Sequence, residues 1–193
     1  MWFEEASQKC TITVNEDDSD YIYETASIQE YRGRHFDGHR NALHRLLDDH
    51  EVTVRPLGPD TQAAAMEVID AWSQGHTAKM QQSDSTICKE AVSMAQELRL
   101  DGLVFEVDGR PTGLLIGTPL TAEMYCIMFK KTSCQLKGLS PYMFQAAARS
   151  IGSKYRYLNW EQDLGEEGLR KAKESFHPLR KAKKGAVKLA SMI

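Results

Sequence analysis

The stretch "DGLVFEVDGRPTGLLIGTPL", residues 101–120, carries the clearest structural signal in the sequence. Two apolar runs flank Asp108 and Gly109, and this dipeptide is typical of the tight turn of a β-hairpin. A third run rich in strand-forming residues, "EMYCIMFKK" at 123–131, follows directly. The sequence therefore predicts three consecutive antiparallel strands.

The segments around these strands have the patterns of helices and single strands. Ser140 and Pro141 have the pattern of the N-cap and the first residue of a helix over 141–151, which a strand at 154–160 follows. Upstream, two helices are predicted at 59–76 and 84–100. Four residues of the first are expected to face inward: Ala64, Val68, Ala71 and Trp72.

The N-terminal part has weaker patterns. It predicts a strand at 9–14, an acidic loop at 15–20, a mostly helical region at 21–50 interrupted near Gly33 and Gly38, and a strand at 52–57. The resulting order is helix, helix, three antiparallel strands, helix, strand, helix. This order predicts an α/β (α+β) protein with the fold of the Gcn5-related N-acetyltransferases (GNAT-like fold), in which a mixed, mostly antiparallel central sheet is flanked by helices.

Length and composition indicate one ordinary globular domain. The chain has 193 residues, of which 41% are hydrophobic and 26% charged. No apolar stretch is long enough to cross a bilayer, and the N-terminus carries acids where a secretory signal is basic, so we expect a cytoplasmic protein. We divide the chain into an N-terminal strand and acidic loop (1–20), which could be the remnant of a preceding domain, a GNAT-like domain (21–180) and a basic tail (181–193).

Charge is distributed unevenly along the chain, although the net charge is only −3. Residues 1–31 contain eight acids and one lysine, whereas residues 170–188 contain eight Lys/Arg and one acid. A basic segment of this kind favours phosphate groups of RNA or of an anionic membrane, and a solvated tail is the alternative.

Cysteine and histidine spacing predicts no metal site. The four cysteines form no C-x-x-C pair. His35, His39 and His44 have metal-like spacing only on a continuous helix, which Gly38 argues against. We therefore expect free thiols and no bound metal.

The stretch "NWEQDLGEEGLRKAKESFHP", residues 159–178, combines a helix-capping pattern with polar residues that the cap does not explain. Asp163 and Glu166 form a capping-box pattern, and apolar residues then recur at helical spacing. This predicts a helix that begins at Asp163. The cap leaves Asn159, Glu161 and Arg170 unexplained.

Three stretches resemble a known family. These are "HFDGHRNALHRL" (35–46), "LDGLVFEVDGRPTGLLIG" (100–117) and "YLNWEQDLGEEGLRKAKESFHP" (157–178). They resemble the C-terminal catalytic domain of bacterial phosphatidylglycerol lysyltransferases and their soluble, uncharacterised relatives. In that family two GNAT-like halves are fused, and an amino acid moves from aminoacyl-tRNA to the glycerol hydroxyl of an anionic lipid.

The resemblance implies roles for the unexplained residues. Glu161 or Asp163 would be the acid/base or orienting carboxylate, and Asn159 a polar donor. The residues expected to bind substrate are Arg170, Lys173, Lys131, Arg40 and Asn41. The expected partners are aminoacyl-tRNA and an anionic phospholipid, with peripheral contact at the inner membrane face and no cofactor. An oligomeric state does not follow from the sequence.

The chain departs from the family pattern in two ways. Lys130-Lys131-Thr132 stands where the family usually shows Glu-Lys-Ala, so a cation replaces an acid. A preceding GNAT-like half and a membrane-embedded region are also missing.

The loop "QLKGLS", residues 135–140, keeps two other functions open. Gln135, Gly138 and Ser140 come close to the loop with which acetyltransferases hold the pyrophosphate of coenzyme A, and a Ser-Pro helix cap explains the loop about as well. A lipid or tRNA phosphate is a further ligand for it. The alternatives are therefore an acetyl-coenzyme A-dependent N-acyltransferase and a non-catalytic binding or regulatory half-domain.

Overall fold

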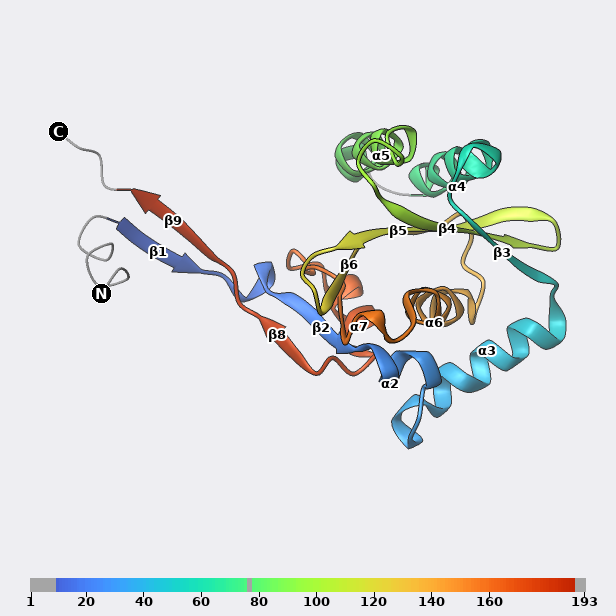
Figure 1. Cartoon of the computed structure of the whole chain (residues 1–193), viewed down its shortest axis with the longest axis horizontal. Helices are drawn as coiled ribbons and strands as arrows, with labels where there is room; N and C mark the ends of the chain where they lie inside the picture. The colour runs from blue at the N-terminus through green and yellow to red at the C-terminus, as the bar shows by residue number, and fades with distance from the viewer. Residues whose placement is uncertain (1–9, 76–77, 190–193) are drawn as a thin grey trace.

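The computed structural model describes residues 10–75 and 78–189. Within them the strands form a seven-stranded sheet in the order β3-β4-β5-β6-β7-β2-β8 and a separate two-stranded ribbon, β1-β9. All pairings are antiparallel except the parallel one between β6 and β7. The predicted mixed, mostly antiparallel sheet flanked by helices is confirmed (Figure 1).

The central hairpin follows the prediction. β4 (Asp101–Val107) and β5 (Arg110–Pro119) flank the Asp108-Gly109 turn, and β6 (Met124–Thr132) pairs with β5. Both turn residues have positive φ, which a tight hairpin turn requires. β3 (Val52–Pro56) extends the sheet on the other side of β4.

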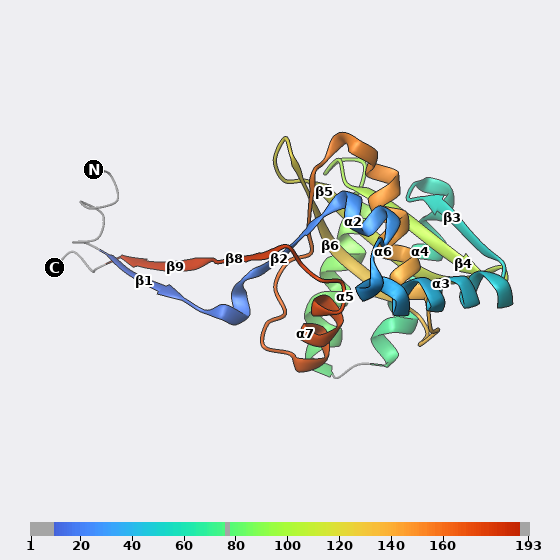
Figure 2. The ribbon, with the colours of Figure 1, turned by 90° about the horizontal axis from the view of Figure 1, so that it is seen from below.

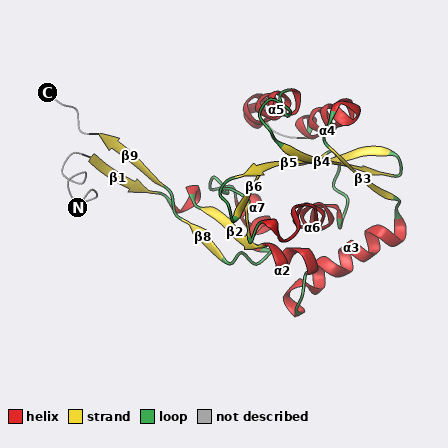
Figure 3. Cartoon of the chain, in the orientation of Figure 1, coloured by secondary structure: helices red, strands yellow, loops and turns green. Residues whose placement is uncertain are grey.

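Helices cover both faces of the sheet (Figure 3). α4 (Gln62–Gln74) and α5 (Ala78–Ser93) pack on one face. α2 (Thr25–Glu30), α3 (Asp37–Asp49), α6 (Leu139–Ile151) and α7 (Glu167–Glu174) lie on the other. Val68 and Trp72 of α4 are buried as predicted, whereas Ala64 and Ala71 are only partly buried, and Ala65 and Ile69 take the inner positions.

The region 21–50 is less helical than predicted. Residues 21–23 belong to strand β2 (Asp20–Glu24), in which Tyr21, Ile22 and Tyr23 are all buried. Aromatic and β-branched residues favour a strand, and β2 lies between β7 (Tyr157–Asn159) and β8 (Arg180–Ala182), where both faces are covered. Gly38 does not interrupt α3, which is continuous from Asp37.

Two further boundaries differ from the prediction. α6 begins at Leu139 with Gly138 as its N-cap, so Ser140 and Pro141 lie within the first turn. Gly138 has φ 94°, and an added Cβ would lie 2.2 Å from the Ala42 carbonyl oxygen of α3. α5 ends at Ser93, and the chain then turns.

The expected basic tail contributes strands in its described part. β8 pairs with β2, and β9 (Gly185–Leu189) pairs with β1 (Cys10–Val14). The β1-β9 ribbon projects from the rest of the molecule (Figures 1 and 2). Partners supplied by the N-terminal segment are invisible to local sequence patterns, which is why these strands were missed.

Candidate functional site

The sheet opens between β6 and β7. The two strands pair only through Met124↔Tyr157, Tyr125↔Leu158 and Cys126↔Asn159, and beyond Cys126 strand β6 pairs with β5 alone. Residues 160–163 follow β7 at this opening, and the backbones of Trp160 and Glu161 are still hydrogen-bonded to Tyr21 of β2. The predicted carboxylates Glu161 and Asp163 belong to this segment.

Asn159 fixes the backbone at the opening. Its amide Nδ2 donates to Asp20 Oδ2 at 2.9 Å, and its Oδ1 accepts from the backbone N–H of Glu161 at 2.7 Å. Both ends of this buried amide are therefore engaged, and Asn159 positions Glu161.

Glu161 has an unusual backbone and a partly buried carboxyl group. Its φ is 45°, a left-handed conformation that costs a non-glycine residue energy. Its carbonyl oxygen accepts from the Tyr21 N–H at 3.0 Å. Burial raises the pKa of the Glu161 carboxyl, and the nearby Lys173 ammonium opposes this rise. Within the described residues Glu161 makes no ion pair.

Asp163 has a different role from the one that its capping pattern predicted. Helix α7 begins at Glu167, and its N-cap, Glu166, makes no side-chain cap hydrogen bond. Asp163 is 1% exposed and accepts hydrogen bonds from Tyr21 Oη (2.6 Å) and Gly165 N (2.9 Å). The chain turns through Leu164 and Gly165, both with positive φ, before the helix starts.

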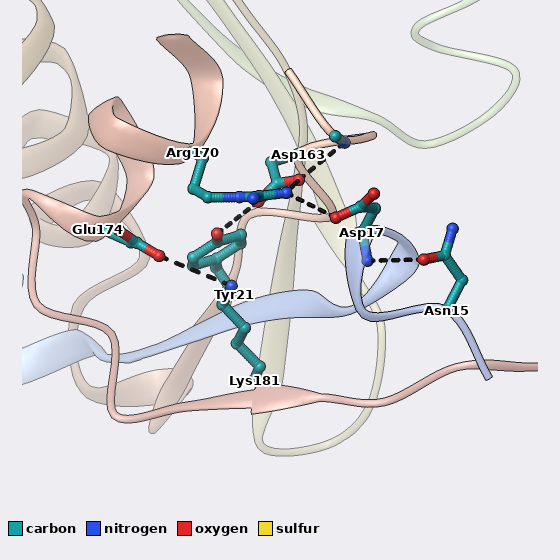
Figure 4. Close-up of polar contacts among 8 residues, drawn as sticks. Asn15, Asp17, Tyr21, Asp163, Arg170, Glu174 and Lys181 are labelled. Carbon is teal, nitrogen blue, oxygen red and sulfur yellow. Dashed lines mark hydrogen bonds and ion pairs between the residues drawn. The ribbon is translucent and has the colours of Figure 1, made fainter. Parts of the chain in front are cut away.

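Arg170 completes this cluster (Figure 4). Its guanidinium donates to both oxygens of Asp163, at 3.0 and 3.1 Å, and to Asp17 Oδ1 at 2.6 Å. Arg170 holds the pKa of Asp163 far below its ordinary value, and Asp163 in turn raises the pKa of Arg170. We call Asp17, Tyr21, Asp163 and Arg170 the carboxylate–arginine joint. It ties α7 to β2, so Arg170 is already neutralised by protein carboxylates.

Lys173 lies one turn further along α7 in different surroundings. It is 3% exposed, donates to the Trp160 carbonyl oxygen, and its Nζ is 4.8 Å from the centroid of the Trp160 ring. Burial lowers the pKa of Lys173 to about 8, while Glu161 opposes this shift.

Lys131 is not brought together with Lys173. It projects from the face of β6 that α4 and α5 cover, where its Nζ lies 3.8 Å from the centroid of the Trp72 ring and pairs with Asp84. Lys131 therefore anchors the helical layer on the opposite face.

Arg40 and Asn41 have contacts unrelated to Glu161. Arg40 donates to the carbonyl oxygens of Tyr31 and Gly33 and to Asp37, and so secures the turn before α3. Asn41 is exposed.

The loop 135–140 is shaped by packing. The close approach of α3 explains Gly138, and Gln135 is exposed. The Ser140 hydroxyl accepts from the Lys130 ammonium.

Lys130 and Trp160 are residues of this region that the sequence reasoning did not select. Lys130 Nζ is 4.7 Å from the centroid of the Trp160 ring, on the α6 side of β6. The only sequence signal for Lys130 was its departure from the family's acidic residue. Trp160, 9% exposed, gave no signal beyond its apolar character.

A cavity of about 330 Å³ lies elsewhere, near the C-terminal end of α6. Its lining includes Leu103, Leu115, Tyr125, Ile151 and Tyr155, and none of the predicted site residues. Residues 10–75 and 78–189 contain no group of three or more His, Cys, Asp or Glu side chains that could hold a metal ion. The helices within these residues are all too short or too polar to cross a membrane.

The parallel β6-β7 pair in an otherwise antiparallel sheet, with helices on both faces, gives the chain a GNAT-like fold. The family model for "Phosphatidylglycerol lysyltransferase, C-terminal" matches residues 2–185. The chain belongs to this family, as the resemblance predicted. No curated protein matches.

Solved structures agree on the fold. A conserved protein of unknown function from Bacteroides thetaiotaomicron superposes with a TM-score of 0.88 at 24% identity, covering 98% of this chain and 66% of that one. The C-terminal domain of a putative lysylphosphatidylglycerol synthetase from Agrobacterium fabrum gives 0.67 at 16% identity, covering 94% and 62%. L-PGS from Bacillus licheniformis gives 0.65 at 13% identity, covering 97% and 64%. The chain thus spans less than two thirds of each of these relatives.

Proposed function

We propose that this chain is an aminoacyltransferase-type domain that acts where β6 and β7 separate, moving an amino acid from aminoacyl-tRNA to a hydroxyl of an anionic lipid. Family membership supports the reaction class. The observation that carries the proposal is the state of Glu161, which is partly buried, has a raised pKa and is held in a strained backbone conformation by Asn159.

Glu161 is the proposed proton acceptor. The acceptor hydroxyl oxygen attacks the carbonyl carbon of the aminoacyl ester, and its proton passes to the Glu161 carboxylate. The bond to the ribose oxygen then breaks, and that oxygen takes the proton. A carboxylate with a raised pKa is a stronger base than an ordinary one, which suits this role. The proposed reaction needs no acetyl-coenzyme A and no other cofactor.

The proposal places the domain at the cytoplasmic membrane face, where the two substrates meet. A second candidate is a non-catalytic half-domain, because the chain spans less than two thirds of its solved relatives. Such a half-domain would bind tRNA or lipid without transfer.

A transfer assay separates these two functions. Aminoacyl-tRNA with a radiolabelled amino acid is incubated with phosphatidylglycerol vesicles and wild-type protein, Glu161→Gln or the control Glu167→Gln, which alters an exposed carboxylate of α7. We expect Glu161→Gln to lose transfer by about 100-fold or more with an unchanged melting temperature, as for removal of a general base. Equal transfer by Glu161→Gln and wild type would refute the role of Glu161. Absence of transfer by wild type with retained tRNA or lipid binding would favour the half-domain.

A further inference from the structure

Two lysines from different elements lie against one tryptophan. Lys130 comes from β6 and Lys173 from α7, and their ammonium nitrogens are 4.7 and 4.8 Å from the centroid of the Trp160 ring. Trp160 directly follows β7, so the three side chains meet where the sheet opens.

Among the described residues neither ammonium forms an ion pair, although Glu161 lies near enough to Lys173 to oppose the lowering of its pKa. Within the described residues, Lys130 donates to the Ser140 hydroxyl and Lys173 to the Trp160 carbonyl oxygen, and both acceptors are neutral. Other lysines of this chain do form ion pairs, for example Lys131 with Asp84 and Lys184 with Asp20. A charge removed from water without a counter-ion is costly, so buried charges in proteins are normally paired or bind a ligand.

The surroundings disfavour cations further. Ser140 lies in the first turn of α6, and the start of a helix attracts anions and repels cations. Burial, together with the nearby Lys173, lowers the pKa of Lys130 to about 7. An oxyanion bound here would favour the protonated form of both lysines and would also lie near the start of α6.

We infer that Lys130 and Lys173 form a binding site for a phosphate group of a ligand, held against Trp160. Two ammonium groups match the charge of close to −2 that a phosphate monoester carries near neutral pH. The phosphate is either free or part of a glycerol phosphate headgroup. Only the assignment to a headgroup rests on the proposed function, because the site itself follows from the two unpaired cations.

Arg170, one turn before Lys173, does not take part because Asp163 and Asp17 neutralise it.

Calorimetric titration tests the site directly, without tRNA and without transfer. Inorganic phosphate and, separately, glycerol 1-phosphate are titrated into the full chain in phosphate-free, low-salt buffer. The variants are Lys130→Met, Lys173→Met and Lys130→Arg, with Lys188→Met, an exposed lysine of β9, as the control. We expect wild type, Lys130→Arg and Lys188→Met to bind, and each of the other two methionine variants to bind about tenfold more weakly or worse.

The two titrants identify the source of the phosphate. Tighter binding of glycerol 1-phosphate assigns a headgroup, and equal binding assigns free phosphate. Circular dichroism shows whether each variant folds. If a methionine variant does not fold, Lys130→Arg, which keeps the positive charge, is compared with wild type instead. Absence of phosphate binding by wild type, or binding by Lys130→Met equal to wild type, would overturn the inference. Absence of transfer by the wild-type protein with intact phosphate binding would instead refute the proposed function alone.

Discussion

Arg170 and Lys173 lie three residues apart on α7, yet their charged groups have opposite surroundings. Arg170 meets Asp163 and Asp17, which neutralise it. Lys173 lies against the Trp160 ring, and a second cation, Lys130, lies near the same ring. A cation with matched carboxylates holds the structure together, whereas a buried cation without them marks a place for a ligand.

The carboxylate–arginine joint is a structural element. Asp163 is acceptor-only when ionised, and four hydrogen bonds from Tyr21, Gly165 and Arg170 satisfy it. Figure 4 shows Tyr21 of β2 and Arg170 of α7 converging on Asp163. A residue saturated in this way has no free oxygen for a proton-transfer role, which favours Glu161 as the working carboxylate.

The largest expected effect comes from breaking the joint. Asp163→Ala leaves Arg170 and the buried Tyr21 hydroxyl without their main acceptor, and we expect the free energy of unfolding to fall by about 3 kcal/mol. For a chain of this size this lowers the melting temperature by about 6 to 12 °C. Thermal unfolding followed by circular dichroism measures it.

The matched control is Glu167→Ala. It removes an exposed i,i+4 pair with Lys171 on the same helix and should change the melting temperature by less than about 2 °C. If the two variants were equally stable, the joint would not hold α7.

Lowering the pH should remove the stability that the carboxylate–arginine joint contributes. Because the folded-state pKa of Asp163 lies below its unfolded value of about 3.9, the joint contributes fully above that pH and is lost as the pH falls further. We therefore expect the difference in melting temperature between wild type and Asp163→Ala to be constant from pH 7 to pH 5. The difference should then shrink towards pH 2. A difference that stayed constant down to pH 2 would contradict the assignment of the charge to Asp163.

An intermediate effect of the opposite sign is expected at the lysine pair. Lys130→Met removes an unpaired cation and keeps a long apolar side chain, so at pH 6 it should stabilise the fold by about 1 to 2 kcal/mol, a rise of about 2 to 8 °C. A stability gain from removing a residue is typical of functional positions.

The pH dependence of this gain checks its cause. The pKa of Lys130 is lowered to about 7 in the folded protein, against about 10.4 when unfolded. From pH 7 to pH 10 the folded wild type has released a proton that the unfolded chain still binds, so wild type becomes more stable relative to Lys130→Met. The gain should therefore be largest at or below pH 7 and shrink steadily as the pH rises above 7. A Lys130→Met variant less stable than wild type at pH 6 would show that the ammonium is structural.

The smallest expected effect concerns the basic C-terminal segment. Lys181, Lys183 and Lys184 pair with Glu174, Glu16 and Asp20, which leaves the segment less basic than its sequence. Glu16→Gln releases Lys183, an exposed side chain, and should strengthen low-salt binding to phosphatidylglycerol vesicles a few-fold without altering the melting temperature. Vesicle co-sedimentation over a salt series measures this. Binding that was equal in both proteins, or insensitive to salt, would mean that Lys183 does not reach lipid.

Local patterns were sufficient for the elements that stabilise themselves locally. The Asp108-Gly109 hairpin is confirmed because its turn residues and flanking apolar runs carry all the information it needs. The fold class and the family are confirmed for a related reason: the order of elements and three long motifs are properties of sequence alone.

Elements whose partners lie far along the chain were predicted wrongly or missed. Residues 21–23 were assigned to a helix because their strand partners, β7 and β8, lie more than 130 residues away. Asp163 has a capping-box pattern with Glu166. In the structure its carboxylate oxygens instead accept hydrogen bonds from Arg170, Gly165 and Tyr21. The predicted roles of Glu161, Asn159 and the substrate-binding residues stay predictions, with their surroundings now defined.

The sequence by itself determined the hairpin, the order of helices and strands from β3 to α7, the family and the opposite charges of the two chain ends. Only the tertiary structure decided what those charges do. Acids of residues 16–20 lie beside cations of residues 170–184 because β1 and β2 run antiparallel to β9 and β8. A charge acts according to its neighbours and its access to water, and both are set by folding. Arg170 and Lys173 are therefore both cations in the sequence. Only the fold makes Arg170 part of the carboxylate–arginine joint and Lys173 a candidate ligand contact.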